Sequence, residues 1–160
     1  MIDGVVDTIE TDVSIGDTLP GYLDQYTLSA FLTTYGEATE VWLATYSSPP
    51  GGGPGSDGIL PFVVVLFYPE QGIAALYDDL GEIVDDMVRG CPQAYPVSTL
   101  RLWTPNSDFT FEQLVSNSSS FNREYLPLEE STGMDVTTFY ERFKDPDNIT
   151  CLETPANLWR

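Results

Sequence analysis

One segment of ten residues sets the strongest limit on what this chain can fold into. Residues Ile59–Tyr68 read Ile-Leu-Pro-Phe-Val-Val-Val-Leu-Phe-Tyr, without alternation between apolar and polar positions. A strand that faces water on one side alternates, so this run predicts a strand that is buried on both faces. The segment is too short to cross a bilayer as a helix, which needs about 20 residues. The sequence therefore predicts a β-containing fold with this whole strand in its core.

The segments around this run have the pattern of further strands joined by turns. Pro69-Glu70-Gln71-Gly72 is typical of a turn, and a second turn is expected at Asp79-Leu80-Gly81. Residues 78–89 could instead form a helix, because their apolar pattern does not fix the period, but we favour the hairpin. The predicted strands are residues 41–46, 59–68, 73–78, 82–89 and 99–103, and Val13 and Ile15 indicate a further strand or an extended arm within residues 1–20.

Two segments have the period of amphipathic helices. Apolar residues recur at i, i+3, i+4 and i+7 in residues 28–35, between Thr27 as a suitable N-cap and Gly36 as a stop. The same spacing recurs in residues 136–143, after Asp135 as N-cap and before a stop at Pro146. A third, short helix at residues 111–115 is indicated by the capping box of Thr110 and Gln113.

These elements predict an α+β fold, an antiparallel β-meander of about five strands with two or three short helices packed on one face. We expect a single domain over residues 1–160, because a chain of this length can bury one core. A loop is expected at residues 47–58, which are rich in Gly and Pro. The tail at residues 145–160 is expected to be extended and to dock Leu158 and Trp159 on the core.

The charged residues are predominantly acidic. The chain has 25 Asp and Glu, six Lys and Arg and no His, for a formal net charge of −19. The absence of His excludes Ser-His-Asp and Cys-His catalytic centres and imidazole metal ligands. Nucleic acid and anionic membrane surfaces are poor partners for such a chain. Solubility or adaptation to high salt would explain the acidity, and so would a cationic partner.

Cys91 and Cys151 are the only cysteines. We expect them to form one disulfide that anchors the C-terminal tail and closes a loop of about 60 residues, stabilising the fold by about 4 kcal/mol on the chain-entropy model. The alternative is a pair of buried free thiols in a cytosolic protein. A disulfide indicates an extracytoplasmic or secreted protein, with an export or lipoprotein signal trimmed from before Met1.

Part of the chain resembles a known structural unit. Residues Thr27–Leu43 place a short helix, Tyr35-Gly36-Glu37-Ala38 and then a strand in immediate succession. This order resembles the helix, Gly-x-Pro-x-x-Val and strand unit of the β-lactamase-inhibitor-protein-like superfamily, which includes small outer-membrane assembly lipoproteins. Residues Tyr77–Val84 resemble its later hairpin, whereas Ala38 replaces the usual Pro and a long insertion follows Gly16-Asp17-Thr18. The resemblance implies helices on one face of an antiparallel meander and non-enzymatic binding roles, and it assigns no functional residue.

Two acidic clusters contain the hard oxygen ligands that calcium prefers. Neither has the spacing of an EF-hand, because Ile149 stands where an oxygen ligand is needed and no Glu follows at the twelfth position. A solvated coat that protects strand edges from aggregation is the simpler explanation. The candidate residues are Asp78, Asp79, Glu82, Asp85 and Asp86 in the first cluster and Asp145 and Asp147 in the second.

Aromatic residues are more numerous than one small core needs. Some will fill the interface between sheet and helices, and the others could form an exposed surface flanked by carboxylates, which suits a cationic partner or sugar rings. We take Trp42, Tyr46, Tyr95 and Trp103 as candidates for this surface. We therefore expect a non-catalytic binding or assembly module without a cofactor, with a basic protein surface or a glycan as partner. The alternatives are a protein inhibitor or carbohydrate-binding domain, and a hydrolase that uses carboxylates only.

Overall fold

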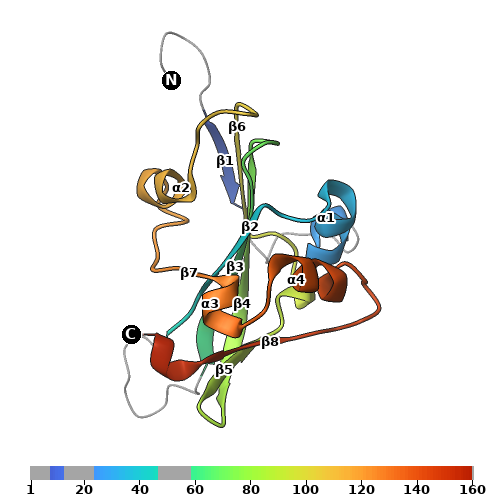
Figure 1. Cartoon of the computed structure of the whole chain (residues 1–160), viewed down its shortest axis with the longest axis vertical. Helices are drawn as coiled ribbons and strands as arrows, with labels where there is room; N and C mark the ends of the chain where they lie inside the picture. Colours follow the sequence, from blue (N-terminus) through green and yellow to red (C-terminus); the bar gives the residue numbers. More distant parts are fainter. Residues whose placement is uncertain (1–7, 13–23, 47–58, 160) are drawn as a thin grey trace.

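The computed structural model describes residues 8–12, 24–46 and 59–159, which form an open antiparallel sheet flanked by short helices (Figure 1). Two strands, β5 (Met87–Gly90) and β8 (Leu152–Pro155), extend the sheet beside the far end of β4. The main path of the sheet is β1 (Thr8–Asp12), β6 (Thr99–Trp103), β4 (Ile73–Val84), β3 (Ile59–Tyr68), β2 (Glu40–Ala44) and β7 (Leu126–Pro127).

Strand β3 lies inside the sheet, between β4 and β2, and its side chains enter two separate clusters. Leu60, Phe62, Val64, Leu66 and Tyr68 belong to the larger cluster, and the residues between them, from Val63 to Phe67, belong to the smaller one. All of these side chains are at most 1 % exposed. The prediction of a strand buried on both faces is confirmed for Leu60 and for residues 62–68, and Pro61 is half-buried.

Helices cover both faces of the sheet, not the single face that the sequence led us to expect. Helices α1 (Leu28–Tyr35), α3 (Leu128–Thr132) and α4 (Val136–Phe143) contribute to the larger cluster. Helix α2 (Phe111–Asn117) contributes Phe111 and Leu114 to the smaller one, on the opposite side (Figure 1). The physical reason is the apolar run itself, because a strand with two apolar faces needs a cover on each.

The predicted helix starts are confirmed in atomic detail. Thr27 accepts a hydrogen bond from the backbone N–H of Ala30 before α1, and Asp135 accepts one from Thr138 before α4. Thr110 and Gln113 form the expected reciprocal capping box before α2. The sequence missed α3, and it missed short 3₁₀ helices at Asp24–Tyr26, Pro92–Ala94 and Ala156–Leu158.

The hairpin that we favoured over a helix at residues 78–89 is present, but its turn was placed wrongly. Strand β4 continues through Gly81 to Val84, and the chain reverses at Asp85 and Asp86 before β5. Both residues have positive φ angles, 50° and 64°, as a two-residue type I′ turn requires. Gly81 serves close packing instead, since a Cβ there would lie 3.2 Å from Cβ of Phe62.

The described part of the chain contains eight strands, more than the five expected. Strand β7 has two residues and β8 ends in a proline, so neither has a recognisable alternating pattern. Strand β1 falls within the segment where a strand or arm was expected, although Val13 and Ile15 lie outside the described residues. The predicted loop at residues 47–58 also lies outside them.

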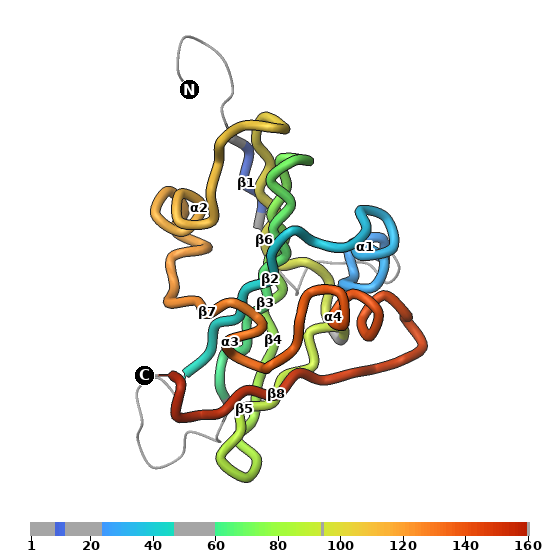
Figure 2. The backbone as a smooth tube through the Cα atoms, viewed as in Figure 1, coloured from blue at the N-terminus to red at the C-terminus, as the bar shows by residue number. Residues whose placement is uncertain are grey.

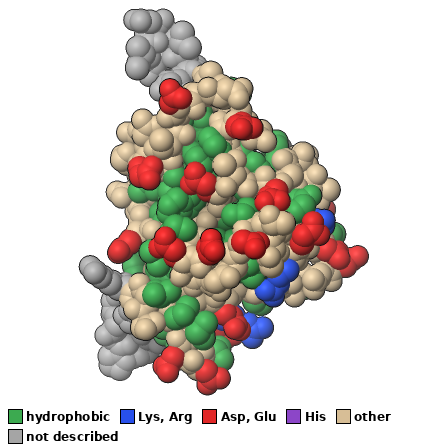
Figure 3. All heavy atoms as spheres, viewed as in Figure 1, with side chains coloured by type: hydrophobic (Ala, Val, Ile, Leu, Met, Phe, Trp, Pro, Cys, Tyr) green, Lys and Arg blue, Asp and Glu red, His purple; other side chains and the backbone are tan. Residues whose placement is uncertain are grey.

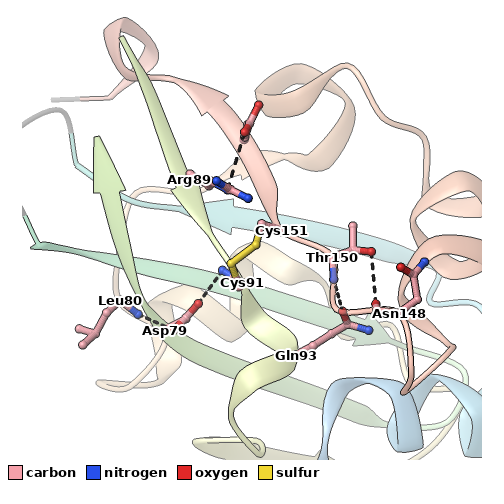
Figure 4. The surroundings of a disulfide bond; sticks show 9 residues. Asp79, Leu80, Arg89, Cys91, Gln93, Asn148, Thr150 and Cys151 are labelled. Atoms are coloured by element: carbon pink, nitrogen blue, oxygen red, sulfur yellow. Dashed lines mark hydrogen bonds and ion pairs between the residues drawn. A yellow bond between two sulfur atoms is a disulfide. The ribbon is translucent and has the colours of Figure 1, made fainter. Parts of the chain in front are cut away.

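The predicted disulfide between Cys91 and Cys151 is present and joins the end of β5 to the start of β8 (Figure 4). Beside it, Gln93 donates to the carbonyl groups of Phe143 and Asp145 and accepts from the N–H of Thr150. The segment from α4 to β8 thereby crosses the molecule and returns to the sheet (Figure 2). Trp159 docks as expected and is 6 % exposed, whereas Leu158 stays 43 % exposed.

Candidate binding groove

Two of the four predicted surface aromatics are packed between the sheet and α2. Trp103 is 7 % exposed and lies between Phe67 and Phe109, with ring centroids 5.4 and 4.7 Å away. Trp42 is half-buried and stacks on Phe111 at 4.3 Å, with the rings parallel to within 1°. For Trp103 the expectation of an exposed binding surface is wrong, because the smaller hydrophobic cluster needs its ring.

The other two candidates are more accessible but lie elsewhere. Tyr46 is 37 % exposed at a small hollow that Arg123 and Trp159 also line. Tyr95 is half-buried, just after the 3₁₀ helix that follows the disulfide. No ring contact joins any two of the four candidates within the described residues. They do not form one aromatic surface.

Trp42 instead lines a groove of about 270 Å³ at the outer side of β2, which we call the acidic groove. Short strand β7 pairs with β2 only at Trp42 and Leu43, so no described strand lies beside the first part of β2 on that side. The start of α3 and the start of α4 complete the walls. The lining residues are Thr39, Glu40, Val41, Trp42, Pro127, Leu128, Glu129, Asp135 and Val136.

Three acidic residues, Glu40, Glu129 and Asp135, line this groove, and none of the described Lys and Arg residues does. The indole N–H of Trp42 donates to Glu40 Oε2 at 2.8 Å, which fixes that carboxylate at the rim. The N–H of Thr138 donates to Asp135 Oδ1 at 2.6 Å and lowers the pKa of Asp135, so this side chain stays ionised at neutral pH. Glu129 is exposed in the first turn of α3. The groove therefore has a negative potential with an apolar floor.

The first calcium candidate cluster is dispersed by the strands that contain it. Asp78 forms an ion pair with Arg123, at 3.1 Å. Asp79 is 6 % exposed and accepts from the N–H groups of Leu80, at 2.7 Å, and Cys91, at 2.6 Å. Burial raises the pKa of Asp79, and these two hydrogen bonds oppose the rise. Glu82 is paired with Arg89 in the register of β4 and β5, and Asp85 and Asp86 form the turn.

The second calcium candidate cluster folds into an exposed turn. Asp145 accepts from the N–H of Asp147 at 3.0 Å, a bond within the turn that follows α4. Within the described residues, no three Asp, Glu, Cys or His side chains converge as metal ligands would. Neither calcium proposal is supported.

Sequence reasoning missed Glu40 and Glu129, and it assigned Asp135 only to a helix cap. These three residues are far apart in the sequence and meet only because β7 pairs with β2 and leads directly into α3. No local motif signals such a meeting. The half-exposed Trp42 next to Glu40 was the one available sign, since Trp42 was among the predicted binding residues.

The described helices are all too short or too polar to cross a membrane. Comparison of the chain with models of protein families, with curated proteins and with solved structures found no match.

Proposed function

We propose that this chain is an extracytoplasmic, non-catalytic binding module that holds a cationic side chain of a partner protein in the acidic groove. The observation that carries the proposal is that Glu40, Glu129 and Asp135 line one groove together with Trp42, while no described Lys or Arg lines it. An arginine or lysine of a partner would supply the missing charge. The disulfide supports placement outside the cytoplasm.

The size of the groove favours a side chain over a larger ligand. Its volume of about 270 Å³ is below the roughly 300–1,000 Å³ of ordinary small-molecule pockets. An oligosaccharide would also need an exposed aromatic face, and Trp42 is half-buried with one face stacked on Phe111. The apolar stem of Lys or Arg matches the floor formed by Val41, Leu128 and Val136.

A carboxylate hydrolase has less support from the structure. Such an enzyme needs two facing carboxylates, one of them held protonated in a cleft. Among the described residues Asp79 is the one buried Asp or Glu, and both of its oxygens accept backbone N–H groups. These bonds give Asp79 a structural role between β4 and the disulfide.

The proposal is tested by titrating the protein with the peptide acetyl-Gly-Arg-Lys-Arg-Gly-amide and measuring binding by calorimetry in about 0.05 M and 0.15 M salt. We expect saturable binding that weakens with salt, because exposed charges are screened over about 8–10 Å. The triple variant Glu40→Gln, Glu129→Gln and Asp135→Asn should bind at least tenfold more weakly. The amide side chains keep the contacts with Trp42 and Thr138, so the fold is preserved.

A matched control separates the groove from the general negative charge. Glu70→Gln, Asp108→Asn and Glu112→Gln remove the same charge from exposed residues that do not line the groove. This control should bind like the original protein. Equal weakening in both triple variants would show non-specific attraction to a chain of net charge −19 and would refute the proposed site.

A further inference from the structure

A second groove, which shares no lining residue with the acidic groove, lies along the outer edge of β8. Strand β8 pairs with β5 alone, so its other edge has no partner strand in the described structure. The N–H of Ala156 donates to the carbonyl of Asp86, at the end of this pairing. Backbone hydrogen bonds to a neighbouring strand alternate along an antiparallel strand, so the backbone groups of Leu152 and Thr154 also face β5. The backbone N–H and C=O groups of Cys151 and Glu153 then face outward, away from β5.

This edge opens into a groove of about 500 Å³, which we call the β8 groove. Its lining includes the backbone stretch from Thr150 to Glu153 and apolar side chains of Met134 and Ile149. Ile149 is 78 % exposed, which is unusual for a large aliphatic side chain. The groove therefore combines an unpaired strand edge with a mostly polar lining in which Ile149 is an exposed apolar side chain.

The charge of the β8 groove is opposite to that of most of the surface. The chain has six Lys and Arg, of which Arg160 is outside the described residues, and two of the remaining five, Arg89 and Arg142, line this groove. Glu153 is the one carboxylate among the described residues of the lining. On the face shown in Figure 3, acidic side chains are widely spread, whereas the few basic ones gather toward the lower right.

Both arginines have capacity left for a ligand. Arg142 is exposed and forms no ion pair within the described residues, in contrast to Arg101, Arg123 and Lys144. Arg89 reaches Glu153 only at 3.8 Å, with both side chains about half exposed, and such a contact contributes little. Figure 4 shows Arg89 on the strand next to the one that Cys151 begins.

We infer that the β8 groove binds an extended segment of a partner protein that contains an acidic side chain. The segment adds to the free edge of β8 through the outward backbone groups of Cys151 and Glu153, and its carboxylate forms a charge-assisted contact with Arg142. Pro155 lacks an N–H group and ends the available edge, so the added strand is short. Affinity then depends on the carboxylate and on apolar contact with Ile149.

The test uses the ¹⁵N-labelled full chain and the peptide acetyl-Thr-Val-Glu-Val-Thr-amide, followed by NMR. The amide signals of Cys151 and Glu153 should shift and exchange with solvent at least threefold more slowly, because the added strand bonds to them. The variant Arg142→Glu should weaken binding at least tenfold. The variant Lys144→Glu makes the same change of charge at a neighbouring residue outside the groove and should have no effect.

Three results would overturn the inference. Sodium acetate at the same concentration could reproduce the shifts, which would show an anion site without strand addition. The peptide with Lys in place of Glu could bind equally well at the β8 edge, which would exclude a role for the arginines. Equal binding of the Glu-containing peptide by the Arg142→Glu variant would exclude a role for Arg142. These results do not test the acidic groove, because that groove is tested with the cationic peptide acetyl-Gly-Arg-Lys-Arg-Gly-amide.

Discussion

At the scale of single residues, several acidic side chains of this protein have local structural roles. Asp135 begins α4, Asp79 joins β4 to Cys91, and Asp85 and Asp86 adopt the positive φ angles of a turn. Asp tolerates such turns and caps because its short carboxylate bonds to nearby backbone N–H groups. The acidity is therefore partly a consequence of how the chain begins and ends its elements.

The role of Asp135 predicts a pH-dependent stability difference. Its pKa lies below the ordinary value of 3.8, so the stabilisation is present above that pH and is lost as the pH falls through the lowered pKa. Asp135→Ala should lower the thermal midpoint more at pH 7 than at pH 2, measured by circular dichroism. Asp135→Asn keeps a capping oxygen without the charge, so it should be less stable than the original at pH 7 and match it at pH 2. An Asp135→Ala loss of equal size at both pH values would contradict the role of the ionised carboxylate.

At the scale of elements, the hairpin of β4 and β5 needs glycine at the two positions, Gly81 and Gly90, that pack against Phe62. A Cβ on Gly90 would overlap the ring of Phe62 and lie 2.8 Å from its Cβ. We expect Gly90→Ala to lower the free energy of unfolding by about 1–3 kcal/mol, the usual cost of overpacking. Chemical denaturation measures it.

Two further variants check the cause of that loss. At Gly81 the nearest atom to a new Cβ is 3.2 Å away, so Gly81→Ala should cost clearly less than Gly90→Ala. In a Phe62→Leu background the cost of Gly90→Ala should shrink, because the shorter side chain leaves room. An equal loss of unfolding free energy in Gly81→Ala and Gly90→Ala would mean that contact with Phe62 is not the cause. The same conclusion would follow if Phe62→Leu left the effect of Gly90→Ala unchanged.

The same elements show what the sequence could predict. Features that depend on residues close together in the sequence were predicted correctly. These are the helix caps at Thr27, Thr110 and Asp135 and the burial of β3. The turn at Asp85 and the face covered by α2 depend on which strands pair and what each face must bury, and both were predicted wrongly. The acidic groove depends on the pairing of Trp42 with Pro127, which no local pattern encodes.

At the scale of the whole molecule, the net charge of −19 opposes folding by self-repulsion. We expect the thermal midpoint to rise as sodium chloride is raised from about 0.01 M to 0.15 M, because the Debye length falls from about 30 to 8 Å. Calcium chloride at equal ionic strength should give no greater rise, since the described carboxylates do not converge on a metal site. A midpoint that is flat or falls with salt would contradict this view of the charge.

The central claim is that the acidic groove, rather than the acidic surface as a whole, receives a cation. The indole N–H of Trp42 reports on it directly, because it donates to Glu40, whereas the indole of Trp159 donates to Thr154 outside the groove. Titration of the ¹⁵N-labelled protein with acetyl-Gly-Arg-Lys-Arg-Gly-amide should shift the Trp42 indole signal in a saturable way and leave that of Trp159 in place. An unchanged Trp42 signal, or equal shifts of both indoles, would contradict the claim.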